Sequence, residues 1–388
     1  MKIRGRVLVL AVSMPIVAFA VIGGFMSKAM AREDSYQYLR IFEDVVSLIL
    51  NNYVEEVNVD KVMHGAMHGL ADGLDPDSAY LDAAQVKILD KGDSLAAGQT
   101  GLEITRQYYL RVIAARDGSP AAKAGLMPGD YIRAIDGQST RDTTVYEGQR
   151  LLRGKPGTKV RLTVLRGNAV EPHEIDLVRE DLPALAVKSR MAGASVGYVR
   201  VAEFGKNTAE QIKSEIASVQ KSGAKGVVID LRGTAFGDVD TGLAAARLFV
   251  KSGVLAYRQD RGKEKEAINA ATGDGAITVS TVLLTDNGTS NGAEVFAAAL
   301  SGNKRAQLIG ERTLGRAAHQ KLVRLPDGGA LMLTHLIYLT PASVAIHEKG
   351  LAPDVAVQQP EIDFGQPQPT ADAALDKAIA TLTAKAAG

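Results

Sequence analysis

From residue 197 onward the chain alternates between short apolar runs and amphipathic segments, and this alternation constrains the fold more than any other feature. Residues 197–204 and 226–231 read as strands. Between them, Ile212, Ile216 and Val219 share one face of a helix. Strands that alternate with helices predict an α/β domain with parallel strands. The pattern continues with a helix near 243–250, a strand at 282–284, a helix near 293–300 and a strand at 307–309.

Other patterns surround this domain. Apolar residues at helical spacing predict two helices between residues 36 and 71, which would form a small helical subdomain. Short β-rich runs between glycine turns cover about 98–181 and predict a separate β domain. A β-hairpin is expected at 321–338, and an alanine-rich helix from about Asp372 follows a proline-rich linker. The turn at 74–78 carries no predicted chemistry.

The amino terminus predicts export. Three basic residues within the first six precede an uncharged run at 7–26, which ends before Ala29-Met30-Ala31. We expect a signal peptide cleaved after Ala31, or a membrane anchor through residues 7–26, since the run is about long enough to span a bilayer. Both forms place the protein in the periplasm or cell envelope.

Composition excludes several functions. The net charge is +1, so no general field attracts nucleic acid, and the chain has no cysteine for disulfides or thiolate chemistry. His64 and His68 have the spacing of two ligands on one helix face. The zinc-peptidase pattern needs a glutamate after the first histidine, where Gly65 stands, so we favour a structural or surface role over a metal site.

Residues 118–130, followed by Ile132 and 135–137, closely resemble the middle of a PDZ domain. Such domains add an extended peptide as a strand and hold its carboxylate with the amides of a glycine-led loop. The resemblance implies peptide capture at that loop. A spacer or lid is the alternative, because Glu103 could repel a carboxylate. The loop would comprise Gly101, Leu102, Glu103 and Ile104.

Further motifs in a fixed order resemble the carboxyl-terminal-processing, or tail-specific, protease family. They lie at residues 52–54, 74–76, 197–200, 230–232, 288–289, 310–313 and 349–354. The resemblance implies a multidomain α/β protein with a crotonase-like protease core, an inserted PDZ domain and a helical N-terminal subdomain. It also implies an exported serine endopeptidase whose serine is deprotonated by a lysine, with no metal or cofactor.

The two positions of that dyad are substituted. The family segment Gly-Thr-Ala-Ser-Ala-Ser-Glu reads here from Gly288 to Glu294, which puts Asn291 on the nucleophile. The family lysine follows 25 residues later, and Arg316 stands there. Arginine stays charged and cannot act as a base, and an amide offers no ordinary acyl-enzyme route. Gln320 matches the glutamine that orients the lysine in the family.

The oxyanion region is altered as well. Of the two glycines that end the family motif Leu-Arg-Asn-Asn-Pro-Gly-Gly, this chain keeps only the last, Gly237, and a bulky Phe236 replaces the other. The remaining oxyanion amide would be that of Gly292. We predict catalytic impairment, and a hydrogen bond between Asn291 and Arg316 in place of the dyad.

An active enzyme is the alternative, with Ser290 as nucleophile and Lys304 or Lys321 as base. Moving one residue at a helix start rotates a side chain by about 100°, so we expect Ser290 to be a helix cap instead. A structural envelope protein is the third hypothesis.

The leading hypothesis is a binder of protein carboxyl-terminal tails, acting as an adaptor, a decoy or a partner of an active relative, and able to self-associate. The expected domains are a signal or anchor (1–31), a helical subdomain (32–95), a PDZ domain (96–182), a protease-like core (183–360), and a linker with a C-terminal helix (361–388).

Overall fold

The computed structural model of the protein describes residues 36–91, 96–167, 171–360, 362–366 and 369–387. The chain divides into two compact units, 1–67 and 68–388. Residues 36–52 form a helix and α2 (Val59–Asp72) follows, which confirms the two predicted helices. The predicted signal or anchor at 1–31 lies outside the described residues. Within the described part of the chain, no helix is long and apolar enough to cross a membrane.

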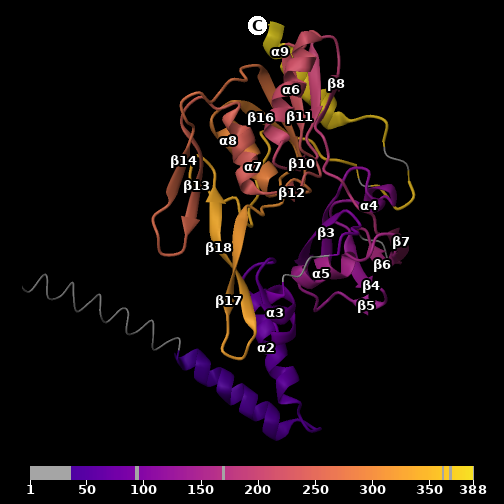
Figure 1. The fold of residues 1–388 in the computed structure, drawn as a ribbon, viewed down its shortest axis with the longest axis vertical. Helices are drawn as coiled ribbons and strands as arrows, with labels where there is room; N and C mark the ends of the chain where they lie inside the picture. The colour runs from indigo at the N-terminus through magenta and orange to yellow at the C-terminus, as the bar shows by residue number, and fades with distance from the viewer. Residues whose placement is uncertain (1–35, 92–95, 168–170, 361, 367–368, 388) are drawn as a thin grey trace, which may run out of the picture. The chain divides into compact units, whose positions relative to one another are not determined.

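The central sheet of the second unit has six strands in the order β19-β16-β15-β11-β9-β8 (Figure 1). All neighbouring strands run parallel except β8 and β9, which confirms the predicted α/β core. The strands are β8 (Lys188–Met191), β9 (Val196–Arg200), β11 (Gly226–Asp230), β15 (Ser280–Thr285), β16 (Ala306–Gly310) and β19 (Val355–Ala356).

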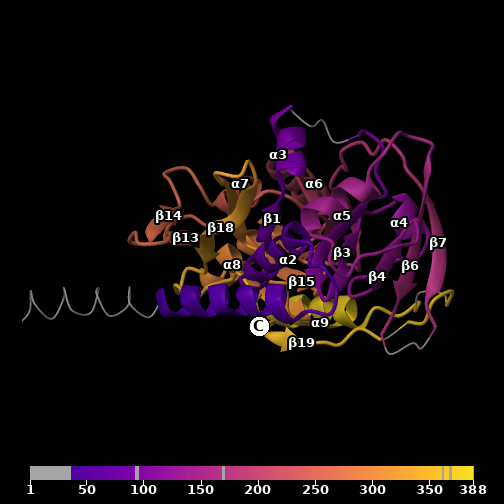
Figure 2. The ribbon, with the colours of Figure 1, turned by 90° about the horizontal axis from the view of Figure 1, so that it is seen from below.

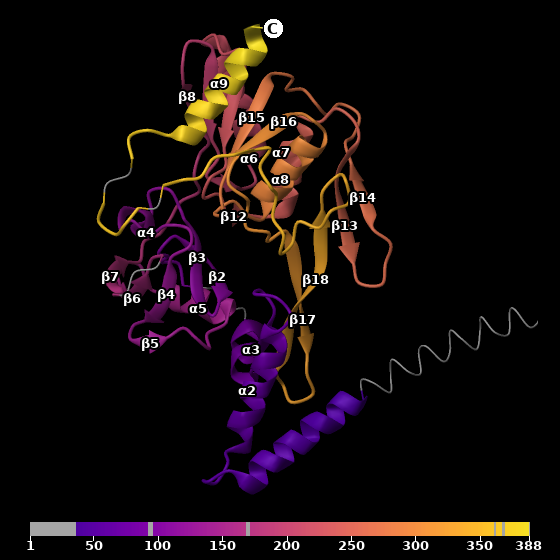
Figure 3. The same ribbon diagram turned by 180° about the vertical axis from the view of Figure 1, so that it is seen from behind.

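Alternate residues of these strands face two different helical layers. On β11, Val227 and Ile229 pack with the helices of one face, whereas Val228 packs with Ala378 and Leu382 of the C-terminal helix on the other (Figure 3). Buried parallel strands need this cover on both faces. The first layer holds α6 (Thr208–Lys221), α7 (Val239–Arg247) and α8 (Gly292–Gly302), and the second holds α9 (Ala373–Ala387).

Helix α7 begins earlier than the sequence predicted. The Asp238 side chain accepts a hydrogen bond of 2.8 Å from the Thr241 N–H and caps the helix, which then starts at Val239 rather than near 243. Hydrophobic spacing alone did not reveal this cap.

A second sheet contains the predicted hairpin. Strands β17 (Ala318–Arg324) and β18 (Ala330–Leu339) pair antiparallel and confirm it. Strands β13 (Val254–Asp260) and β14 (Glu266–Asn269) extend this sheet and were not predicted. Strand β1 (Ala79–Leu81) pairs with β18, although we had assigned these residues to the helical subdomain. A run of three residues is too short to show alternation. Helix α3 (Ala83–Asp90) follows β1.

The region predicted to be a PDZ domain folds as a sheet in the order β2-β3-β4-β6-β7, with β2 at its edge. Ile132 and Ile135 are both buried although they are three residues apart, because a register shift between Ile132 and Ala134 returns both to the core. The elements are β2 (Leu102–Gln107), β3 (Tyr109–Ala115), α4 (Pro120–Lys123), β4 (Tyr131–Ile135), β5 (Gln138–Ser139), α5 (Val145–Leu152), β6 (Lys159–Leu165) and β7 (His173–Val178).

This domain lies on one side of the core, and the β13–β14 hairpin lies on the other (Figure 2). Two ion pairs join the domain to the core strands. Arg116 contacts Glu203 at 2.5 Å, and Arg200 contacts Asp117 at 2.9 Å. Glu203 belongs to β10 (Glu203–Phe204), which pairs in parallel with β12 (Phe236–Gly237).

Candidate functional site

The turn between β15 and α8 positions Asn291. Asp286 anchors this turn by accepting hydrogen bonds from the N–H groups of Gly233 (2.9 Å) and Gly288 (3.0 Å). Asn291 then adopts φ 53° and ψ −123°, and α8 begins at the next residue. A non-glycine residue with positive φ is strained, and such strain concentrates at functional sites. A sharp strand-to-helix turn of this kind presents a nucleophile in other hydrolases.

The Asn291 side chain makes its hydrogen bond to a residue other than Arg316. Its Nδ2 donates a hydrogen bond of 3.1 Å to the carbonyl oxygen of Ala235. The predicted hydrogen bond between Asn291 and Arg316 is therefore wrong. The reason is electrostatic, because two carboxylates compete for the guanidinium and both are stronger acceptors than an amide oxygen.

Arg316 is held between Asp77 and Glu103. Its Nε donates to Asp77 Oδ2 at 3.0 Å, its Nη2 lies 2.8 Å from Asp77 Oδ1, and its Nη1 lies 2.7 Å from Glu103 Oε1. The Arg316 side chain is only 17% exposed. Burial alone would lower the pKa of Arg316, but the charges and hydrogen bonds of Asp77 and Glu103 outweigh it and raise that pKa. The guanidinium is thus charged and fully paired.

Asp77 is a site residue that sequence reasoning missed. It lies in the turn at 74–78, to which we assigned no chemistry, and its side chain is 6% exposed. Nothing in the local pattern distinguishes it from an ordinary turn aspartate. The only signal was indirect: a buried arginine requires a carboxylate, and neither neighbour of Arg316 in its loop supplies one.

Glu294 holds the segment that carries Arg316. Its carboxyl accepts hydrogen bonds from the N–H groups of Gly315 (2.6 Å) and Arg316 (2.7 Å) and from the Thr313 hydroxyl. Glu294 is fully buried on α8. Burial raises its pKa to about 7, although these hydrogen bonds oppose the rise. The chemistry of this site therefore includes a carboxyl that titrates near neutrality.

The other predicted catalytic positions do not converge on Asn291. The Nε2 of Gln320 donates to the Thr334 hydroxyl at 3.2 Å, within the β17–β18 hairpin, rather than orienting residue 316. Lys304 follows the far end of α8 and is exposed, as is Lys321 on β17. Neither lysine stands at the start of α8 to act as a base.

Ser290 is buried and its hydroxyl has no partner. It is 1% exposed, and its Oγ makes no hydrogen bond within the described residues. The predicted helix-cap role of Ser290 is wrong, because Asn291 occupies the cap position and its own side chain makes no capping bond. The main chain compensates, since the Ser290 carbonyl accepts from the Ala293 N–H at 3.2 Å.

The oxyanion region is closely packed backbone. A Cβ on Gly237 would lie 2.0 Å from the Phe204 carbonyl oxygen, and a Cβ on Gly292 would lie 2.2 Å from that of Asp238. Only glycine fits at either position. Phe236 is half-buried and packs with the cluster of Ile113, Ala114 and Ala235.

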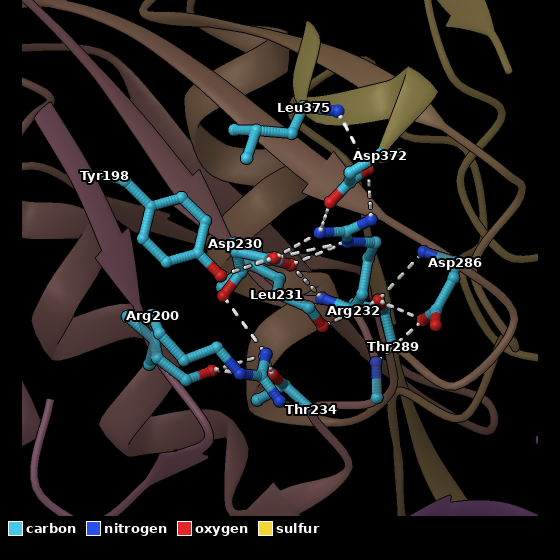
Figure 4. A network of polar contacts seen from close by, with 12 residues as sticks. Tyr198, Arg200, Asp230, Leu231, Arg232, Thr234, Asp286, Thr289, Asp372 and Leu375 are labelled. Carbon is cyan, nitrogen blue, oxygen red and sulfur yellow. Dashed lines mark hydrogen bonds and ion pairs between the residues drawn. The ribbon is translucent and has the colours of Figure 1, made fainter. Parts of the chain in front are cut away.

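A polar network fixes the loop that carries these groups (Figure 4). Arg232 forms paired hydrogen bonds with Asp230 and with Asp372, and Tyr198 donates to Asp230 at 2.8 Å. Arg200 donates to the Thr234 hydroxyl at 3.1 Å. Burial raises the pKa of Asp230, but hydrogen bonds and charge from Arg232 outweigh it and hold the pKa below its usual value. The network thereby positions the Ala235 carbonyl that receives Asn291.

The predicted peptide-binding residues occupy the start of the edge strand β2. Gly101 has φ +81°, and a Cβ there would lie 2.2 Å from Ser119 Cβ, so the turn needs glycine. Leu102 and Ile104 point into the domain core. Glu103 faces Arg316, and its pKa is raised by burial against the opposing charge of Arg316. Arg316 also donates to the Ile104 carbonyl at 3.4 Å.

A pocket of about 290 Å³ adjoins Arg316. It lies between the far end of β2 and the loops around residues 76, 315 and 347. No group of three or more metal-ligating side chains occurs among the described residues. The ring of His68 contacts Tyr80 edge-on at 5.5 Å.

Comparison with known proteins gives matches along most of the chain. Residues 195–357 match peptidase family S41, residues 111–166 match a PDZ domain, and residues 23–85 match the activating protease CtpB N-terminal domain. A carboxy-terminal-processing protease of Bartonella bacilliformis is 30% identical over 360 residues, covering 89% of this chain and 83% of that protein.

Two further relatives agree. The carboxy-terminal processing protease CtpA of Bacillus subtilis is 32% identical over 315 residues, covering 81% of this chain and 67% of that protein. Among solved structures, a photosystem II D1 C-terminal processing protease matches with a TM-score of 0.67 and 27% identity. That match covers 82% of this chain and 92% of the solved one.

Proposed function

Because the chain belongs to peptidase family S41, among the carboxyl-terminal-processing proteases that carry a PDZ domain, we propose that it is a catalytically impaired member of that family. In this proposal it captures the carboxyl-terminal tails of proteins and serves as an adaptor or regulator. No metal or cofactor takes part.

The environment of Arg316 carries the proposal. A serine-type mechanism needs a base that can exist in its neutral form next to the nucleophile. Arg316 occupies the base position, remains charged, and uses its guanidinium on Asp77 and Glu103. The amide of Asn291 in the nucleophile position bonds a main-chain carbonyl. In this proposal, Arg316 and Asn291 therefore have structural roles at the positions where the family has its catalytic residues.

The edge strand β2 supports tail capture. An edge strand has unpaired main-chain groups that an extended peptide can join, and Gly101 gives the turn before β2 its positive φ. Glu103 does not leave a free negative charge beside this edge, because it pairs with Arg316 at 2.7 Å. The repulsion that favoured a mere spacer is thereby reduced.

Tail capture is tested with a fluorescent peptide that ends in apolar residues, measured by anisotropy against the protein. We expect saturable binding that weakens at least several-fold when the peptide's terminal carboxylate is amidated, since the amide loses a charge-assisted hydrogen bond. Equal affinity for the acid and the amide would contradict capture of a chain terminus. Absence of binding to both would favour the structural envelope hypothesis.

Self-association belongs to the same proposal. The helix at 36–52 exposes large apolar side chains, including Tyr38 (73% exposed), Leu39 (61%) and Leu48 (60%). Apolar surface of this kind marks association sites. Light scattering should show an oligomer that the pair Leu39→Asp and Leu48→Asp dissociates. An unchanged mass would contradict this contact, and an active relative would be the next partner to test.

We also propose export, by the charged and apolar pattern at residues 2–31. Fractionation of cells that express the tagged protein should place it in the envelope, either released after Ala31 or retained through residues 7–26. Recovery in the cytoplasmic fraction would contradict export without affecting the site.

A further inference from the structure

Asn291 is followed by Gly292 and has an unusual backbone conformation. When a glycine follows asparagine, the glycine nitrogen can attack the side-chain carbon Cγ and close a five-membered imide. The ring contains the Cα, Cβ, Cγ and carbonyl carbon of asparagine together with that nitrogen. Ring closure is fastest when the nitrogen already lies on the same side as Cβ.

The backbone of Asn291 meets this requirement. The substituents of an L-residue are spaced by about 120° around Cα, so the next nitrogen eclipses Cβ when ψ is about −120°. Asn291 has ψ −123°. This value lies outside the broad α and β regions, so an unfolded chain adopts it rarely. The fold thus holds a conformation that the reaction otherwise has to reach by a fluctuation.

The attacking nitrogen belongs to a buried glycine. Gly292 has no side chain to hinder it, and among the described residues its N–H has no recorded hydrogen-bond acceptor, as expected for the first position of a helix. Helix α7 packs closely against Gly292, because a Cβ on Gly242 would lie 2.1 Å from the Gly292 carbonyl oxygen. The strained conformation therefore cannot relax easily.

The Asn291 side chain has to break one hydrogen bond before it can react. Asn291 Nδ2 donates to the Ala235 carbonyl, and turning Cγ toward Gly292 gives up this hydrogen bond of 3.1 Å. Asn291 is half-buried, so water reaches the site. Nothing else among the described contacts opposes the rotation.

We propose that Asn291 is a self-modification site, at which Asn291 and Gly292 form a succinimide that hydrolyses to aspartate or isoaspartate. The Gly292 nitrogen loses its proton and bonds to Asn291 Cγ, the Cγ–Nδ2 bond breaks, and ammonia leaves. One water then adds to either imide carbonyl, and the C–N bond at that carbonyl breaks. The balance is one water consumed and one ammonia released, with no change in oxidation state.

The modification places a carboxylate where the family has its nucleophile. A negative charge at the start of α8 is favourable, because the free amides and the dipole of the helix meet it there. This inference does not depend on the proposed function. It holds whether the protein binds tails, cleaves them or does neither.

The chain contains a matched control four residues earlier. Asn287 also precedes a glycine, is exposed, and does not have a positive φ. The N–H of its glycine, Gly288, already donates to Asp286 at 3.0 Å. The two pairs therefore share sequence chemistry and differ in conformation.

The test incubates the full-length protein at neutral pH, folded and in urea, and follows both asparagines by peptide mapping. Fragmentation distinguishes the two sites, and the product replaces an NH group by an oxygen. We expect Asn291 to convert several-fold faster in the folded protein than in urea, and several-fold faster than Asn287 in the folded protein. The two rates should become similar in urea.

A slower conversion of Asn291 in the folded protein than in urea would overturn the proposal, as would no conversion of folded Asn291 while Asn287 converts. Two variants confirm the assignment. Asn291→Gln should lose the conversion at 291, because its ring would need six members, whereas Asn287→Gln should leave the rate at Asn291 unchanged.

Discussion

In the proposed function, the residue at position 316 would have to lose a proton for catalysis, and arginine stays protonated. The structure adds a reason for the arginine to stay, since it neutralises two buried carboxylates contributed by distant segments, Asp77 and Glu103. Arginine suits this task because its fork donates to several acceptors at once. Arg316 therefore has a structural role at this position, as the counter-charge of both carboxylates.

Replacing Arg316 should strongly destabilise the protein. Arg316→Met leaves Asp77 and Glu103 buried without a counter-charge, a loss of about 3–5 kcal/mol in the free energy of unfolding. Adding Asp77→Asn and Glu103→Gln should restore part of that loss, because the unpaired charges are then gone. Urea denaturation measures both effects.

Arg312→Met is the matched control. Arg312 is exposed and donates only to the Lys349 carbonyl at 3.1 Å, so its removal should change the free energy by less than about 0.5 kcal/mol. If Arg316→Met and Arg312→Met were equally mild, the Arg316 ion pairs would not have the structural role assigned to them.

The buried hydroxyl of Ser290 gives a second prediction at this scale. Ser290→Ala should stabilise the fold by about 1 kcal/mol, because it removes a buried polar group that has no partner. Thr289→Val should instead destabilise the fold, since the Thr289 hydroxyl makes hydrogen bonds to the Leu231 carbonyl and to Asp286. A marked loss of stability in Ser290→Ala would show an interaction that the structure lacks.

At the scale of residues, the sequence singled out Asn291 and Arg316 but did not predict the hydrogen-bond partners of either. Register against the family motif assigned Asn291 and Arg316 to the dyad positions, and that assignment stays a prediction. The predicted bond between them was wrong because the partner of Arg316 comes from residue 77, and no local pattern reveals which distant carboxylate a buried cation will reach.

At the scale of elements, helix α8 and the segment at 313–316 act as one assembly through Glu294. Its carboxyl accepts from two main-chain N–H groups and one hydroxyl of that segment. The pKa of about 7 makes this assembly sensitive to pH. Below pH 4.5 the glutamate is protonated in both the folded and the unfolded chain.

Stability should fall between pH 4.5 and about 7 for this reason. In that window the unfolded glutamate ionises while the buried one keeps its proton, so the folded state binds more protons and the free energy of unfolding decreases with pH. At about 1.4 kcal/mol per unit of pKa, the contribution is about 3 kcal/mol. Denaturation at several pH values measures it.

Glu294→Gln should flatten this part of the profile, because the amide does not titrate. Glu210→Gln, at an exposed position on α6, should leave the profile of the native protein unchanged. A Glu294→Gln variant with the same pH dependence as the native protein would assign that dependence to another group.

Prediction of helices and strands succeeded where the hydrophobic pattern extended over many residues. It failed where the element was short or its pattern weak. Helices α6, α8 and α9 have buried faces that repeat over several turns, and the parallel strands are continuous apolar runs. Strand β1 has only three residues, β14 is mostly exposed, and β13 has only two buried residues, so none of them shows a clear alternation of apolar and polar residues. Pairing with β18 determines β1 and β13, and pairing with β13 determines β14.

At the scale of the whole second unit, a few charged contacts join the PDZ domain to the core. They comprise Arg116 with Glu203, Arg200 with Asp117, and Arg316 with Glu103. The linker contributes as well, since Phe364 lies 3.8 Å from the Arg166 guanidinium and packs on the domain core. The order of domains was readable from motifs, whereas these contacts depend on side chains far apart in sequence.

The same contacts limit what reversion can restore. A lysine at 316 would stand between Asp77 and Glu103, which favour its protonated form and so oppose its use as a base. We expect Asn291→Ser with Arg316→Lys to cleave weakly at best. Adding Glu103→Gln and Asp77→Asn should increase cleavage, as measured with an unfolded protein substrate. A double variant that cleaves fully would show that these carboxylates do not hold the lysine charged.

The most direct test of catalytic impairment is cleavage of an unfolded protein with an apolar carboxyl terminus by the native chain, beside an active family relative as positive control. The account predicts no cleavage by the native protein under conditions in which the relative digests the substrate. Cleavage by the native protein that disappears in Ser290→Ala would contradict the account and make Ser290 the nucleophile.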